Sequence, residues 1–236
     1  MSLEADLDRA RDLSVADLAD AVESIGFECT RCGGCCKAVE PDDGETQEHT
    51  ATLFPDEARE LLDATDEGFD REYDWRDVAR PMPYGLSEGE DGPEGETFEW
   101  ALQTDACGDC TFYREADDGT GACTVHGERP LICRTYPFSV VLGEADDEDA
   151  AVAQPMGEAV DREGPVRAHE CEGLGRDISR ADAEELAAAL KQRAVRELEE
   201  AIAVRENYEP RPDADGVVVH DSEGPKRPDG TPLNSR

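Results

Sequence analysis

The stretch FECTRCGGCCKAV, residues 27–39, places four cysteines within eight positions, and no other feature constrains the fold as strongly. They are Cys29, Cys32, Cys35 and Cys36. Three cysteines spaced C-x2-C-x2-C can surround one metal centre, because each two-residue step turns the next sulfur inward. Gly33 and Gly34 allow a close approach of the backbone and can direct N–H groups at sulfur. The adjacent Cys35 and Cys36 project in different directions, so they can serve two centres, or one can remain a free thiol.

Five more cysteines follow at wider spacing: Cys107, Cys110, Cys123, Cys133 and Cys171. Eight thiolates could build two four-sulfur sites, and nine leave one cysteine over. Tetrahedral sulfur suits zinc and iron–sulfur centres alike, so the pattern indicates metal without identifying it. His126 and His169 stand near Cys123 and Cys171 and could supply nitrogen, although a surface position or one beside the ligands is the simpler interpretation. We expect His49 and His220 in solvent.

The N-terminal segment MSLEADLDRARDLSVADLAD is acidic and lacks a continuous apolar run, so it does not resemble a signal peptide. The longest apolar runs are too short to span a bilayer. We therefore expect a soluble, cytoplasmic protein with no membrane partner. In a reducing cytosol clustered thiols are more often metal ligands than disulfides, which remain the alternative.

The charge of the chain limits its partners. It has 59 acidic and 23 basic residues, a net charge of −36, and only three lysines. Such a composition is typical of halophilic proteins, because concentrated salt screens the self-repulsion. A disordered acidic chain is the alternative, which the helical patterns disfavour. A surface this negative repels phosphate backbones, so we expect no nucleic acid and an unidentified protein as partner.

Helix signals are clear in three places. Ser14 and Asp17 form a capping box before an apolar pattern that ends at Gly26. Pro55 suits the first turn of another helix. The longest helix is expected from about Ser179 to Glu206, with a core-facing stripe. That stripe consists of Leu186, Leu190, Val195, Leu198 and Ile202.

Strand signals are short. Residues 49–54 and 97–104 are strand candidates, and residues 143–150 suggest a hairpin turn between the strands PFSVVLG and AVAQP. Residues 85–96 are rich in Gly, Pro and Glu and are expected to form a loop.

These signals predict a small, loop-rich α+β fold with short strands and a long C-terminal helix, stabilised by metal. Only 38% of the residues are hydrophobic, so metal binding would supply much of the folding free energy. The expected divisions are an N-terminal helical segment (1–26), a cysteine-cluster metal-binding domain (27–206) and a flexible acidic tail (207–236).

The order of the motifs resembles one family. The chain shows F-x-C-x2-C-G-x-C-C, then C-x2-C, then G-x-C-x3-G-x-R-P-x2-C-R-x-Y-P-F, then C-x-G-x-G, over roughly residues 25–176. This is similar to the cysteine-cluster family with the CxxCxxCC signature, described as zinc- or iron-chelating. A related cysteine-rich segment occurs in flagellin lysine N-methylases. The long acidic insertions of this chain are not part of the pattern.

The resemblance implies eight ligands and leaves Cys107 as the extra cysteine. The eight are Cys29, Cys32, Cys35, Cys36, Cys110, Cys123, Cys133 and Cys171. Pro130 can begin a short helix that presents Cys133. Arg129 and Arg134 can offset the negative charge of a thiolate cluster, or they can pair with surface carboxylates.

Three functions remain open. The first is a metal-chelating protein with an iron–sulfur cluster, or Zn²⁺, in a redox or electron-transfer role. The second, implied only by the resemblance, is a cluster-dependent protein lysine N-methyltransferase. The third is a structural zinc module for protein interaction.

Overall fold

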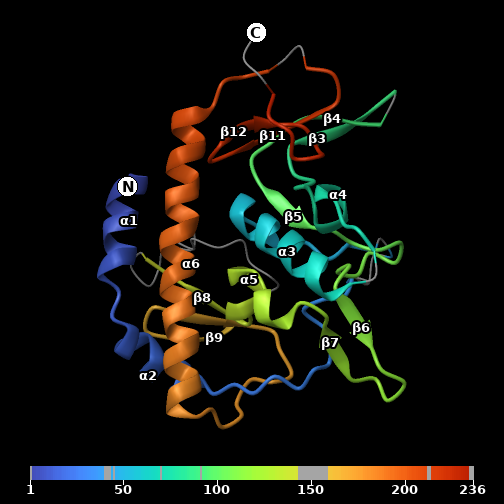
Figure 1. Ribbon diagram of the computed structural model, residues 1–236. Helices are drawn as coiled ribbons and strands as arrows, with labels where there is room; N and C mark the ends of the chain where they lie inside the picture. Colours follow the sequence, from blue (N-terminus) through green and yellow to red (C-terminus); the bar gives the residue numbers. More distant parts are fainter. Residues whose placement is uncertain are drawn as a thin grey trace. The chain divides into compact units, whose positions relative to one another are not determined.

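The computed structural model describes residues 2–39, 44, 46–69, 71–90, 92–142, 159–211 and 214–233, without the side chains of residues 66–68 (Figure 1). Backbone contacts divide the chain into two compact units. The first unit comprises Met1–Cys35 and Leu131–Glu199, and the second comprises Cys36–Pro130 and Glu200–Arg236. The predicted cysteine domain, residues 27–206, is therefore shared between both units.

The first unit combines helices with one small sheet. Its elements are α1 (Leu3–Asp12), α2 (Val15–Ile25), α5 (Leu131–Thr135), β8 (Phe138–Val140), β9 (Ala159–Glu163), β10 (Val166–His169) and most of α6 (Arg180–Asn207). The three strands are antiparallel in the order β8-β10-β9, and α2 contacts β9 and β10. The partner of β8 is thus β10. The predicted turn at 143–150 and the strand AVAQP lie outside the described residues.

Helix α2 is confirmed with its predicted ends. The Asp17 N–H donates to Ser14 Oγ at 3.3 Å, and the Gly26 N–H closes the last turn on Val22 O at 2.8 Å. Leu18 and Val22 are fully buried, which anchors the apolar face of the helix in the core of the first unit.

Helix α6 begins with the predicted capping box but buries a different face. The Asp182 N–H donates to Ser179 Oγ at 3.2 Å, and the Ser179 hydroxyl donates to Asp182 Oδ2 at 2.6 Å. The buried residues are Ala183, Ala187, Ala189, Leu190, Arg193, Ala194 and Leu198. The other members of the predicted stripe, Leu186, Val195 and Ile202, are half-buried. Alanines let neighbouring segments approach the helix axis closely, so the larger side chains lie at the margin.

The described residues of the second unit form three sheets. Its helices are α3 (Pro55–Gly68), α4 (Trp75–Val78) and the short 3-10 helix η1 (His126–Glu128). Its strands are β1 (Thr52–Leu53), β2 (Ala79–Pro81), β3 (Leu86–Gly89), β4 (Gly92–Thr97), β5 (Trp100–Leu102), β6 (Tyr113–Glu115), β7 (Gly121–Cys123), β11 (Val217–Asp221) and β12 (Gly224–Lys226). The sheets have the orders β1-β5-β2, β12-β11-β4-β3 and β6-β7. The predicted helix at Pro55 is confirmed, and residues 85–96 form the β3–β4 hairpin rather than a loop.

The prediction of a flexible tail is wrong for residues 217–226. Strand β11 pairs in parallel with β4 and antiparallel with β12, and Val218 and Val219 are buried. The apolar run VVV is short and has acidic, proline-rich residues before it, so local composition resembles a tail. Its pairing partner, β4, lies far away in the sequence, where no local pattern predicts it.

The mixed helices and strands, the short strands and the long helix α6 confirm an α+β fold. Among the described residues, no helix is both long enough and apolar enough to cross a membrane.

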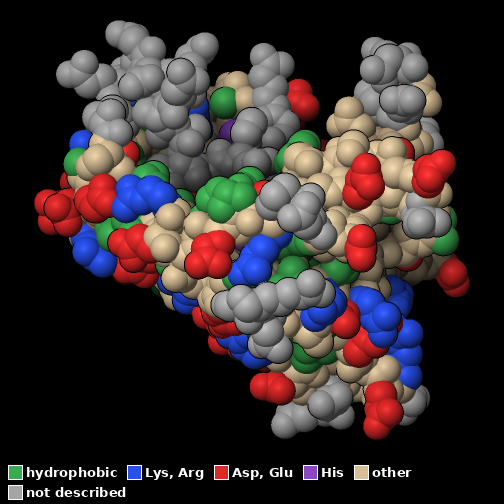
Figure 2. Space-filling view, turned by 90° about the horizontal axis from the view of Figure 1, so that it is seen from above, with side chains coloured by type: hydrophobic (Ala, Val, Ile, Leu, Met, Phe, Trp, Pro, Cys, Tyr) green, Lys and Arg blue, Asp and Glu red, His purple; other side chains and the backbone are tan. Residues whose placement is uncertain are grey.

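Charged side chains are common on the surface, and acidic ones outnumber basic ones in the chain. Figure 2 shows one face, on which Asp and Glu side chains are spread with Lys and Arg among them. Several arginines pair with carboxylates, for example Arg180 Nε with Glu184 Oε1 at 2.8 Å and Arg11 Nη2 with Glu199 Oε1 at 2.9 Å. Exposed pairs of this kind contribute little individually, at most about 1 kcal/mol.

Candidate metal centre

All nine cysteines lie within the described residues, and none of them forms a disulfide. Cys29, Cys32, Cys35, Cys133 and Cys171 belong to the first unit, and Cys36, Cys107, Cys110 and Cys123 to the second. The boundary between the units falls between Cys35 and Cys36. The two adjacent cysteines therefore belong to different units, and the prediction that they serve two centres, or that one is a free thiol, remains a prediction.

A backbone clasp brings the first cysteine of the chain to the last. Residues 26–28 run antiparallel to residues 173–175: the Glu28 N–H donates to Gly173 O at 3.0 Å, and the Gly175 N–H donates to Gly26 O at 3.0 Å. Cys29 directly follows one side of this clasp, and Cys171 precedes the other by two residues. The clasp thus places the CxxCxxC loop beside the turn that carries Cys171.

Two glycines of the clasp, Gly26 and Gly173, are required by space. A Cβ on Gly173 would lie 2.3 Å from the Glu28 carbonyl oxygen, and a Cβ on Gly26 would lie 2.5 Å from the carbonyl oxygen of Arg176. Gly26 also has a φ of 79°, which other residues rarely adopt. The C-x-G-x-G motif therefore gives the backbone the close approach that joins the two cysteine-bearing segments.

Four thiols of the first unit form what we call the four-cysteine group, in which three lie within electrostatic reach of Cys171. They are Cys29, Cys32, Cys35 and Cys171. Burial is the main cause that raises the pKa of Cys171, and the thiolates of Cys32, Cys35 and Cys29 raise it further. The hydrogen bond from the Gly173 N–H lowers this pKa and offsets part of the rise. Like charges gathered in this way disfavour ionisation unless a cation joins them.

Backbone N–H groups face two sulfurs of the four-cysteine group. The Gly34 N–H lies 3.5 Å from Cys32 Sγ, and the Gly173 N–H lies 3.4 Å from Cys171 Sγ. The first contact confirms the prediction that this glycine pair directs an N–H at sulfur. Donors of this kind stabilise thiolate charge, as in iron–sulfur sites.

The four-cysteine group fits zinc or iron in the kind and number of its donors. Cys29 and Cys32 are exposed, and Cys35 and Cys171 are half-buried, so the sulfurs lie near the surface. Across the described part of the chain, no three His, Cys, Asp or Glu side chains stand ready to hold a metal ion. Side-chain rotation would be needed to close the group around a metal, whose charge would offset the mutual repulsion of the thiolates.

Cys133 is the fifth cysteine of the first unit. It lies half-buried on α5, which begins at Leu131 directly after Pro130, as the motif predicts. The exposed Arg134 follows it on the same helix. Among the described residues neither Arg134 nor Arg129 pairs with a carboxylate, and Arg129 Nε instead donates to His126 O at 3.1 Å. The structure thus gives no support to the alternative in which both arginines serve surface ion pairs.

The second unit gathers three cysteines by backbone pairing. The Cys110 N–H donates to Cys36 O at 2.8 Å, and the Tyr113 N–H donates to Cys110 O at 2.9 Å. Tyr113 is in turn the cross-strand neighbour of Cys123. The exposed Cys107 stands on the preceding turn, where its N–H donates to Asp105 Oδ1 at 2.8 Å.

The histidines divide into one exposed and three buried side chains. His126 is exposed on η1, while the ring of His169 faces Ser139, with Nε2 at 2.9 Å from Oγ. The expectation that His49 and His220 lie in solvent is wrong, since they are 8% and 1% exposed. Burial, and next the Arg80 guanidinium, lowers the pKa of His49 to about 4. His220 lies on β11, in the strand that the sequence analysis missed, and packs against the rings of Phe98 and Tyr208, which also contact each other.

Sequence reasoning assigned no role to Tyr136, although it stands in the R-x-Y-P motif. Its hydroxyl donates a hydrogen bond to the Glu170 carbonyl oxygen. Burial raises the pKa of Tyr136, and the thiolates of Cys171, Cys35 and Cys32 raise it further. The ring therefore lies beside the four-cysteine group.

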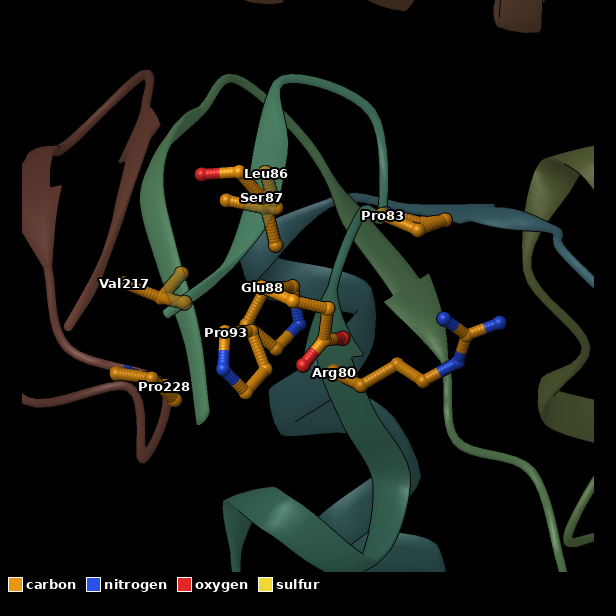
Figure 3. Close-up of a pocket in the computed structure, with 9 residues that line it drawn as sticks. Arg80, Pro83, Leu86, Ser87, Glu88, Pro93, Val217 and Pro228 are labelled. Atoms are coloured by element: carbon orange, nitrogen blue, oxygen red, sulfur yellow. The ribbon is translucent and has the colours of Figure 1, made fainter. Parts of the chain in front are cut away.

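A pocket of about 420 Å³ lies in the second unit (Figure 3). Its lining is largely apolar and includes no cysteine. The lining residues are Arg80, Pro81, Pro83, Leu86, Ser87, Glu88, Pro93, Val217 and Pro228. The Arg80 guanidinium extends away from Pro93 and Val217 in the close-up. This pocket therefore has no thiol chemistry within it.

One comparison with known proteins gives a match. The family model CxxCxxCC, described as "Putative zinc- or iron-chelating domain", matches residues 28–172. The matched range contains all nine cysteines. Comparisons with curated proteins and with solved structures find no match.

Proposed function

The chain belongs to the CxxCxxCC family of zinc- or iron-chelating domains, and from this premise we propose that the four-cysteine group holds one metal centre through its thiolates. We propose further that the centre is an iron–sulfur cluster with a redox or electron-transfer role. Its four ligands would be Cys29, Cys32, Cys35 and Cys171.

One observation carries this proposal. The clasp joins two segments from opposite ends of the matched range, and the four thiols then lie close enough to raise the pKa of one of them. A cation is the simplest means of stabilising four thiolates at one place. Each sulfur needs to lose its proton before it binds metal, so binding would release protons.

The chain's own residues favour electron exchange at this place. The N–H groups of Gly34 and Gly173 are aimed at sulfur and would stabilise the extra negative charge of a reduced centre. The exposed Cys29 and Cys32 would keep the centre near the surface, within reach of a partner protein. When bound, an iron–sulfur cluster supplies one-electron chemistry.

The other two functions have less support. A structural zinc ion would use the same four thiolates, so metal analysis decides between zinc and iron. Methyl transfer would require a place for substrate and cofactor, and the described pocket is lined by no cysteine. No contact in the described residues favours the methyltransferase over the redox protein.

The test is a measurement of metal and acid-labile sulfide on protein purified without oxygen in high salt, together with a visible spectrum. We expect iron, matching sulfide and a brown chromophore. Cys171→Ser should lose this centre, whereas Cys107→Ser, which changes the cysteine that the resemblance leaves over, should retain it. Zinc without iron or sulfide would replace the redox proposal by the structural one. Equal metal content in both variants would reject the four-cysteine group as the site.

A further inference from the structure

Tyr136 lies where three segments of the first unit meet. It follows α5, which carries Cys133, and is separated from β8 by Pro137 alone. Its hydroxyl donates to the carbonyl oxygen of Glu170, the residue just before Cys171. The sulfurs of Cys35 and Cys32, which belong to the CxxCxxC loop, lie close enough to the Tyr136 hydroxyl to interact with it electrostatically.

The backbone around Cys171 is held on both sides. After Cys171, the clasp fixes Gly173 against Glu28. Before it, the His169 N–H donates to Pro137 O at 2.9 Å, and Tyr136 holds the next residue, Glu170. Glu170 directly precedes Cys171, and the Tyr136 hydroxyl makes the hydrogen bond that holds the Glu170 carbonyl oxygen.

We propose that Tyr136 is a positioning residue of the metal centre: its hydrogen bond to Glu170 O sets the direction in which Cys171 presents its sulfur. This inference rests on the proposed function. Outer groups that orient a ligand in this way typically contribute tenfold to hundredfold to metal affinity.

The experiment compares Tyr136→Phe with the wild-type protein and with Tyr208→Phe. The first variant keeps the ring and removes only the donor. The second removes a comparable hydroxyl, which donates to Glu96 Oε2 at 3.0 Å in the second unit, where no cysteine contacts it. Each protein is loaded anaerobically, and we measure the transfer of its metal to a chelator and the reduction potential of the bound centre. If the metal is zinc, the thiolate charge-transfer bands of the cobalt-substituted protein replace the potential.

We expect Tyr136→Phe to bind metal about tenfold to hundredfold more weakly and to shift the potential or the charge-transfer bands. Tyr208→Phe should match the wild type in both. Unchanged affinity and spectrum in Tyr136→Phe would overturn the inference and leave the metal centre standing. Equal weakening in both variants, with an unshifted spectrum, would also overturn it, because that result indicates general destabilisation. Wild-type protein that takes up no metal would reject the proposed function and the inference together.

Discussion

The two units arrange their polar groups in opposite ways. In the first unit the four-cysteine group lies on turns, and two of its thiols are exposed. In the second unit a buried network joins polar side chains: Trp100 Nε1 donates to Asp221 Oδ2 at 2.8 Å, and Lys226 Nζ pairs with the same oxygen at 2.7 Å. Glu223 extends this network to Arg59 at 2.5 Å. We therefore expect the segments around the clasp to depend on a bound metal for their order, whereas ion pairs and sheets stabilise the second unit.

Removal of the metal should give the largest difference in behaviour between the two units. Structural metal–thiolate sites contribute on the order of 10 kcal/mol, so a chelator should abolish order around the clasp. Hydrogen exchange measured by mass spectrometry should show lost protection in residues 26–36 and 166–175, with protection retained in β11. Protection that falls equally in both regions would contradict the comparison.

Asp221→Ala tests the second unit. Removing this carboxylate leaves the buried Trp100 Nε1–H without its acceptor and weakens the pairing of the buried Lys226, although Glu223 still lies 2.6 Å from its Nζ. We therefore expect the free energy of unfolding to fall by about 3 kcal/mol in chemical denaturation. The metal content of the folded fraction should not change. As a control, Asp221→Leu combined with Lys226→Met removes both charges and should cost clearly less than the single change.

Acid should weaken the second unit through His49. The pKa of this buried ring is lowered from 6.5 to about 4, so below pH 6.5 the unfolded state binds a proton that the folded state does not. The stabilisation is complete above pH 6.5 and is lost as the pH falls to about 4, by roughly 3 kcal/mol. His49→Gln should flatten this part of the stability profile, whereas the exposed His126→Gln should leave it unchanged. Parallel profiles for the wild type and His49→Gln would contradict the assignment.

Gly173→Ala gives the smallest of these effects and the most local one. The added methyl would overlap the Glu28 carbonyl, so we expect a loss of about 1–3 kcal/mol together with weaker metal retention. Gly175→Ala is the matched control: a Cβ there meets nothing within 4 Å, so only its φ of 73° is unfavourable. If the two variants retain metal equally well, the clasp does not position the site.

The sequence predicted what depends on near neighbours. Ser14 and Ser179 marked helix starts because a cap bonds only three residues ahead, and Pro130 marked α5 for a similar reason. The cysteine spacing predicted metal chemistry because a CxxC step brings neighbouring sulfurs together by itself. The identity of the metal, the set of ligands and the function remain predictions, because they depend on the metal that the thiols bind.

What the sequence did not show depends on distant partners. Val217–Asp221 pairs in parallel with β4, far earlier in the chain, as well as with its neighbour β12, and the alanine face of α6 is buried by tertiary contacts rather than by its own hydrophobicity. The role of Tyr136 was not visible either, because its hydrogen bond reaches Glu170, far along the chain.

The clasp also has a consequence for the order of synthesis. Its two sides come from opposite ends of the cysteine-rich region, and a ribosome completes the CxxCxxC loop long before it reaches Gly173. Until then the three early thiols have no Cys171 beside them, and they remain open to oxidation or to the wrong metal. The nascent chain would therefore gain from a reducing environment, or from a delivery protein that covers these thiols until the last ligand has emerged.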